Sequence, residues 1–124
     1  MPRVGDLARR DVSTCRLDEP IVDVRERVRA VGWDICVVTN EQCIVLGLLR
    51  RKALEAAPET IAEQVMDPGP STFRVNVSLE EMAHYVREHA LHRALITTSD
   101  GRLVGMLRRD DLERALDEND IRPH

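Results

Sequence analysis

Aromatic side chains are almost absent from this sequence, which has one Trp, one Tyr and one Phe among its 124 residues. Long apolar runs are absent too, because the longest covers only the six residues Ile44–Leu49, far below the ~20 that a membrane-spanning helix needs. Basic residues are not in excess either: 22 acidic residues outnumber 18 basic ones, and the net charge is −4. A basic excess is typical of proteins that bind nucleic acids by electrostatics. The composition therefore argues against a membrane protein and against a nucleic-acid-binding protein.

Catalytic and targeting signals are also missing. The sequence has no GxSxG, HExxH, CxxC or phosphate-loop signature, so it predicts neither an enzyme nor a metal site. One helical face could gather metal-binding side chains, but such residues are common on solvated helix surfaces; they are Glu81, His84, Glu88 and His92. The N-terminus does not resemble a secretory signal, and the three cysteines have no regular spacing. We therefore expect a cytoplasmic protein with reduced thiols.

A repeat is the main feature that the sequence does have. The phrase VLGLLRR at residues 45–51 returns 58 positions later as LVGMLRR at residues 103–109. Residues 3–57 align with residues 61–115 at that offset without a gap. Such a register is strong evidence of an internal duplication. Because a unit of about 55 residues is marginal alone, we expect the two copies to need each other.

Each copy predicts the same elements. A short apolar turn precedes a brief strand that begins at Ser-Thr, and an amphipathic helix follows. The helix is indicated by apolar residues at i, i+3 and i+7, which are Ile21, Val24 and Val28 in one copy and Leu79, Met82 and Val86 in the other. A buried strand, a turn (Asp100-Gly101 in the second copy), the repeated phrase and a short helix complete the copy. The predicted order is β-α-β-β-α, twice, which is an α+β fold.

This order, the tandem pairing and the glycine-centred phrase before a short helix resemble the cystathionine-β-synthase (CBS) domain, whose pairs are called Bateman modules. The resemblance divides the chain into a first CBS motif (1–59), a second (60–117) and a polar tail (118–124). It implies two repeats packed about a pseudo-twofold axis, with clefts between them that bind AMP, ATP or S-adenosylmethionine. It also implies a regulatory role, a homodimer and an effector protein that the sequence does not identify.

The repeated phrase departs from the family pattern. In the family the glycine is followed by two apolar residues, a Thr or Ser near the phosphate, and an Asp three positions later that accepts hydrogen bonds from the ribose. Here Arg50 and Ala53 stand at the hydroxyl and acid positions of the first copy, and Arg108 and Asp111 stand there in the second. The resemblance therefore implies one usable ligand site at most, built around Asp111.

Both marker residues of the second copy have two interpretations. Asp111 either contacts a ligand or only complements the dipole of the helix that it begins. Arg108 either binds a phosphate or fills the cleft and blocks it. The other positions that resemble family contacts are Thr72, Arg93, Ala94 and Ile96 in the second copy and Thr14 and Arg50 in the weaker first copy. Buried or turn-forming strand residues would explain most of them equally well.

Two functions of different classes follow. The first is a regulatory module that senses an adenosine-containing ligand, mainly at the second-copy site. The second is a dimerisation or protein-interaction module with degenerate nucleotide clefts. Asp111 favours the first, and the loss of the hydroxyl from both copies favours the second.

Overall fold

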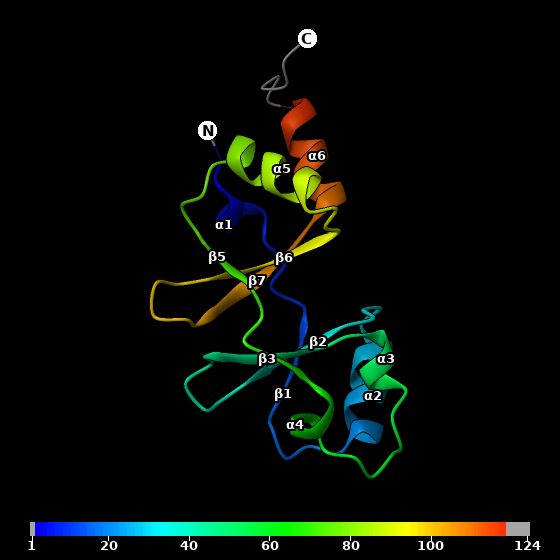
Figure 1. Ribbon diagram of the computed structural model, residues 1–124. Helices are drawn as coiled ribbons and strands as arrows, with labels where there is room; N and C mark the ends of the chain where they lie inside the picture. The colour runs from blue at the N-terminus through cyan, green and yellow to red at the C-terminus, as the bar shows by residue number, and fades with distance from the viewer. Residues whose placement is uncertain (1, 119–124) are drawn as a thin grey trace. The chain divides into compact units, whose positions relative to one another are not determined.

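The computed structural model describes residues 2–118, which form six helices and seven strands. Apart from Glu118, the expected polar tail lies outside the described residues. The chain forms two compact units. The first-repeat unit comprises residues 11–70, and the second-repeat unit comprises residues 2–10 together with residues 71–118. Both units combine helices with a sheet (Figure 1), and the predicted α+β fold is confirmed.

The first-repeat unit contains a four-stranded sheet in the order β1-β2-β3-β4. Strand β1 is parallel to β2, and the other two pairings are antiparallel. All four residues of β2 are buried, so this strand is covered on both faces, as its unbroken apolar run indicates. The elements are β1 (Ser13–Cys15), α2 (Ile21–Ala30), β2 (Cys36–Thr39), β3 (Val45–Leu49), α3 (Arg51–Leu54), α4 (Ala62–Val65) and β4 (Asp67–Pro68).

The second-repeat unit has a three-stranded sheet in the order β5-β6-β7, with β5 parallel to β6 and β6 antiparallel to β7. Its elements are α1 (Val4–Leu7), β5 (Thr72–Arg74), α5 (Leu79–Glu88), β6 (Arg93–Thr97), β7 (Leu103–Arg108) and α6 (Arg109–Glu118). Helices α5 and α6 lie together beside this sheet (Figure 1), and their apolar faces share one buried cluster with side chains of β6, β7 and α1. The order β-α-β-β-α is confirmed in both units.

Local sequence signals account for several element ends. Ser78 precedes α5, and its Oγ accepts a hydrogen bond from the Glu81 backbone N–H at 3.1 Å, which caps the helix. Gly32 follows α2 with φ of 76°, and Gly101 forms the predicted turn with φ of 88°. Helix α6 begins at Arg109, so Asp110 lies inside its first turn.

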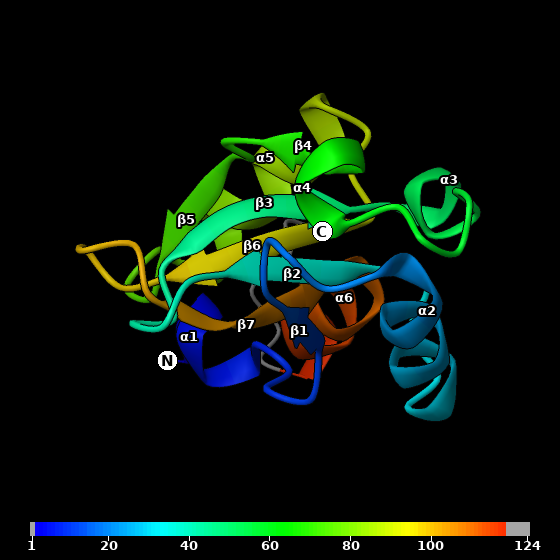
Figure 2. The same cartoon turned by 90° about the horizontal axis from the view of Figure 1, so that it is seen from below.

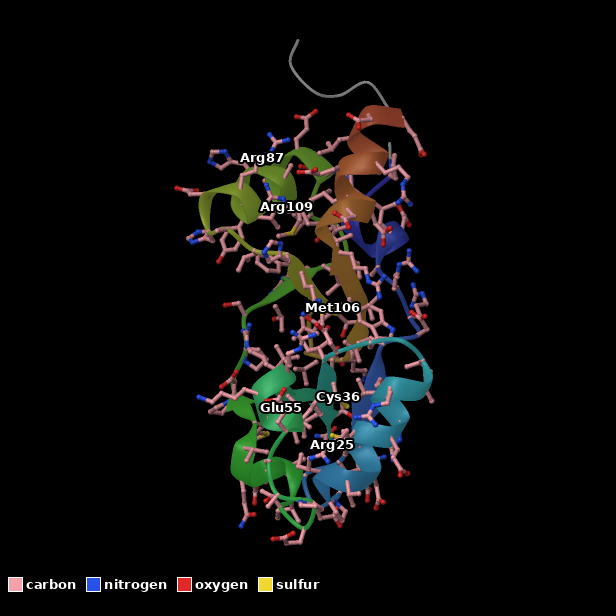
Figure 3. The ribbon with its side chains drawn as sticks, turned by 90° about the vertical axis from the view of Figure 1, so that its right-hand side faces the viewer. Arg25, Cys36, Glu55, Arg87, Met106 and Arg109 are labelled. Carbon is pink, nitrogen blue, oxygen red and sulfur yellow. The ribbon has the colours of Figure 1, made fainter. Side chains whose placement is uncertain are left out.

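The segment that begins each repeat packs on the last strand of the other repeat's sheet. Arg9 exchanges two backbone hydrogen bonds of 2.9 Å with Met106 on β7 (labelled in Figure 3), and β4 pairs with β3 at the equivalent positions, Asp67 with Leu48. Figure 2 shows α1 beside β7. The predicted repeat boundaries follow the duplicated sequence, whereas the compact units follow this packing.

The close approach of these segments explains the glycine of the repeated phrase. A Cβ atom on Gly105 would lie 2.5 Å from the carbonyl oxygen of Arg9, and one on Gly47 would meet Met66 and the carbonyl oxygen of Asp67. Any larger residue would push the docked segment away from the strand. The glycine is repeated because the same backbone contact is made twice.

Candidate functional site

Asp111 lies in the first turn of α6, where free backbone N–H groups and the helix dipole favour a negative charge. Its side chain is only 13% exposed. Its carboxylate accepts two hydrogen bonds from the Arg9 guanidinium, Nε to Oδ2 at 2.7 Å and Nη2 to Oδ1 at 3.2 Å. Arg114, one turn along the helix, has its Nη1 3.5 Å from Oδ1. The predicted ribose acceptor is therefore a well-held carboxylate that already has arginine partners.

These partners set the charge state of the carboxyl group. The hydrogen bond from Arg9 holds the pKa of Asp111 below its ordinary value of 3.8, and it outweighs burial, which acts in the opposite direction. The positive charges of Arg9, Arg114 and Arg108 lower the pKa further. Near neutral pH, Asp111 is consequently an ionised group that accepts hydrogen bonds and donates none.

The lowered pKa of Asp111 predicts a loss of stability in acid. Because the folded state holds this carboxyl group less protonated than the unfolded state, its stabilising contribution is present above about pH 4 and is lost as the pH falls through the folded-state pKa. We expect the free energy of unfolding of the wild-type protein to fall more than that of an Asp111→Asn variant between about pH 5 and about pH 3. Urea denaturation followed by circular dichroism at each pH measures the difference; equal losses in the two proteins would contradict the assignment.

Arg93, Arg108 and Thr72 lie on one face of the β5-β6-β7 sheet. Arg93 and Arg108 are directly opposite in the antiparallel register, and Thr72 is opposite Leu95, two residues from Arg93. Side chains of paired residues, and of residues two apart in one strand, point to the same side of a sheet. Both arginine side chains are partly buried, whereas Thr72 is exposed. Two like charges directly opposite each other disfavour a sheet.

Ala94 and Ile96 lie on the opposite face of this sheet. Both side chains belong to the buried cluster that α5 and α6 cover, and they are 5% and 0% exposed. A ligand on the face that carries Arg93 and Arg108 could therefore contact only the backbone groups of Ala94 and Ile96, not their side chains. The predicted ligand contacts Arg93, Ala94 and Ile96 therefore separate into two faces, because side chains alternate along a strand.

The two predicted residues of the first copy lie in the first-repeat unit. Thr14 is exposed in the middle of β1, and Arg50 immediately precedes α3. The Nε of Arg50 lies 3.0 Å from Oδ2 of Asp67, and both side chains are more than half exposed. Because Ala53 stands at the acid position, this corner has no carboxylate equivalent to Asp111.

The residue that the sequence analysis missed is Arg9. It lies 102 positions from Asp111 along the chain, and no local motif connects the two. The repeat does not indicate the pair either. At the offset of 58, Arg9 is equivalent to Asp67, but its partner Asp111 is equivalent to Ala53, whereas Asp67 pairs with Arg50, the equivalent of Arg108.

A hollow of about 380 Å³ adjoins the Arg9–Asp111 pair. It lies between α1 and α6, and residues from both helices line it, among them Leu7, Asp111 and Arg114. A larger cavity of about 480 Å³ in the first-repeat unit is lined by Trp33, Arg25 and Leu54, and it contains none of the predicted site residues. The hollow beside Asp111 is within the usual size range of small-molecule sites.

Comparisons with known proteins agree with this architecture. Residues 62–118 match the sequence model of the CBS domain family. The uncharacterized protein MK0525 of Methanopyrus kandleri is 25% identical over 117 residues, which is 88% of this chain and 60% of the relative. The chain therefore spans about 60% of the length of this curated relative. No helix in the described part of the chain is long and apolar enough to cross a membrane.

Solved structures resemble the fold closely. CBSX2 of Arabidopsis thaliana, a CBS-pair protein solved in complex with AMP, superposes with a TM-score of 0.83 at 19% identity, covering 97% of this chain and 99% of that chain. The cytosolic domain of the Mg²⁺ channel MgtE in complex with ATP gives a TM-score of 0.83 at 23% identity, covering 93% of this chain and 49% of that chain. The second repeat matches the CBS domain family model, and the first repeat has the same elements in the same order, so the chain carries a CBS domain at residues 62–118 and has the fold of the solved CBS-pair proteins.

Proposed function

We propose that this protein is a regulatory CBS-pair module that binds an adenosine-containing ligand at the site around Asp111. One observation carries the proposal: the second copy keeps an ionised carboxylate, 13% exposed, in the first turn of α6. A carboxylate can accept hydrogen bonds from both hydroxyls of a ribose. A hollow beside it has room for a small molecule.

The candidate ligands are proposed from the compounds bound by similar proteins and from the positive charge of Arg93 and Arg108. CBSX2 was solved with AMP and the MgtE domain with ATP, and S-adenosylmethionine is the third candidate. Arg93 and Arg108 supply positive charge on one face of the sheet that ends at α6, and a guanidinium can bind a phosphate bidentately. Regulation follows if the ligand binds one conformation of the module better than another, because that difference shifts the population that an effector protein meets.

The alternative function is a dimerisation or protein-interaction module without a ligand. The specific observation in its favour is the bidentate Arg9–Asp111 pair, which satisfies the carboxylate without a nucleotide. In that case Asp111 would only stabilise the second-repeat unit. The two functions differ in whether any adenosine compound binds.

Calorimetric titration of the chain with AMP, ATP and S-adenosylmethionine tests the proposal. We expect about one ligand per chain and an affinity at least about tenfold weaker in Asp111→Asn, because hydrogen bonds to a charged acceptor contribute about 1.5–3 kcal/mol each. Asp110→Asn is the matched control, since it removes the same charge from the neighbouring, exposed position of the same helical turn. It should bind like the wild type.

Three results would change the conclusion. Absence of binding with all three compounds at millimolar concentration would favour the interaction module. Equal weakening by both substitutions would reduce the role of Asp111 to general electrostatics. An Arg108→Ala variant that weakens AMP and adenosine equally would remove the proposed phosphate contact.

A further inference from the structure

Arg9 holds Asp111 from a backbone position that is fixed. Its N–H and carbonyl both bond to Met106, and Gly105 permits the close approach. The guanidinium can therefore change partners only by rotation of the side chain. That side chain is 42% exposed and borders the hollow between α1 and α6, so the structure has space into which it can turn.

Arg9 and a ribose would compete for the same atoms. The Arg9 guanidinium uses both oxygens of Asp111, one through Nε and the other through Nη2. A bidentate ribose also needs both oxygens, and Arg114 already lies 3.5 Å from Oδ1. A ligand that takes the carboxylate from Arg9 removes this charge-assisted pair from the 42% exposed guanidinium, and a ligand that supplies another anion replaces it.

We propose that Arg9 determines ligand specificity by exchanging Asp111 for an anionic group of the bound ligand. This inference rests on the proposed function. A ribonucleotide satisfies both partners, because its ribose hydroxyls bond to Asp111 and its phosphate bonds to the released guanidinium. Neutral adenosine satisfies only Asp111. Arg9 therefore selects 5′-phosphorylated ribonucleosides against the uncharged nucleoside.

The test compares AMP with adenosine, by calorimetry, in the wild type and in an Arg9→Gln variant. In the wild type we expect AMP to bind more than about tenfold more tightly than adenosine, as a bidentate arginine–phosphate contact provides. In Arg9→Gln we expect adenosine to bind severalfold more tightly than in the wild type, because its competitor is gone, and the preference for AMP to fall severalfold, with the remainder due to Arg108. Arg102→Gln is the matched control, since it removes the same charge from a 59% exposed side chain of the same unit that is not among the residues lining the hollow. It should keep the wild-type preference.

A second readout uses the wild-type protein alone. The NMR resonance of the ¹⁵N-labelled Nε–H of Arg9 should shift when AMP is added, and this proton should lose its protection from solvent exchange when adenosine is added.

Binding of both ligands with an unchanged AMP preference in Arg9→Gln, or weaker adenosine binding in that variant, overturns the role of Arg9 and leaves the proposed function standing. Failure of both ligands to bind to either protein overturns the proposed function itself. Binding of adenosine to Arg9→Gln but not to the wild type supports the competition directly.

Discussion

Replacement of Gly105 by alanine is expected to destabilise the protein by about 2–3 kcal/mol, the upper part of the usual range for overpacking. The new Cβ would lie 2.5 Å from the Arg9 carbonyl oxygen and 3.0 Å from its carbon, and neither backbone atom can move without breaking the two hydrogen bonds to Met106. The midpoint of thermal unfolding should fall on the order of 10 °C. Differential scanning calorimetry measures the change.

Gly47→Ala is the matched control for Gly105→Ala. Its Cβ would meet first the side chain of Met66, which is flexible and can turn aside, although the Asp67 carbonyl oxygen at 3.0 Å leaves some strain. We expect about half the effect or less. Limited proteolysis should cut the segment before residue 11 faster in Gly105→Ala alone. If both variants are as stable as the wild type, the docked segments are not held as the structure shows.

Replacement of Arg25 by methionine is expected to cost about 2–3 kcal/mol in the free energy of unfolding. Arg25 lies on α2, and its partly buried guanidinium donates from Nε to the Leu54 carbonyl at 2.6 Å and from Nη2 to the Ala56 carbonyl at 2.7 Å. Figure 3 labels Arg25 in the first-repeat unit. Carbonyls at the end of a helix have no partner within it. The Arg25 side chain therefore supplies hydrogen-bond donors to carbonyls at the C-terminal end of α3, a helix of only four residues.

Arg29→Met controls for this change on the same helix. Arg29 is exposed, and within residues 2–118 its side chain has no hydrogen bond or ion pair, so we expect its replacement to change the stability by less than about 0.5 kcal/mol. Urea denaturation of both variants at neutral pH measures the difference. The repeat offers a natural comparison, because Ala83 is equivalent to Arg25 and α6, at ten residues, is long enough to pack its own apolar face. Equal stability of the two variants would refute the capping role of Arg25.

The secondary structure was predictable because its causes are local. Helix α5 follows from Leu79, Met82 and Val86 at helical spacing and from Ser78 before them. Because the sequence is duplicated, each element could be predicted from two copies, and the repeated phrase predicted the same strand and helix in both. Asp111 could be placed at the beginning of a helix for the same reason, since a few neighbouring residues settle where a helix begins.

The sequence only partly predicted which face of the β5-β6-β7 sheet each side chain of β6 lies on. The alternation of side chains along β6 separates Arg93 from Ala94, and the apolar character of Ala94 and Ile96 would have placed them in the core. The resemblance to a family instead grouped all three as ligand contacts. Similarity of position along the chain does not specify which atoms of a residue face a ligand.

The partners of the site residues depended on contacts between distant parts of the chain. Arg9 meets Asp111 across 102 positions because the segment before residue 11 docks on β7 rather than on its own repeat. Spacing and periodicity describe neighbours within one element, whereas this contact arises from a backbone pairing that hydrogen bonds and a missing Cβ at Gly105 make possible. The residue types alone determined the repeat, the secondary-structure elements and the one acid, Asp111, that remains at the family position. Its partner Arg9 was decided only by the tertiary structure, which brings the two residues together.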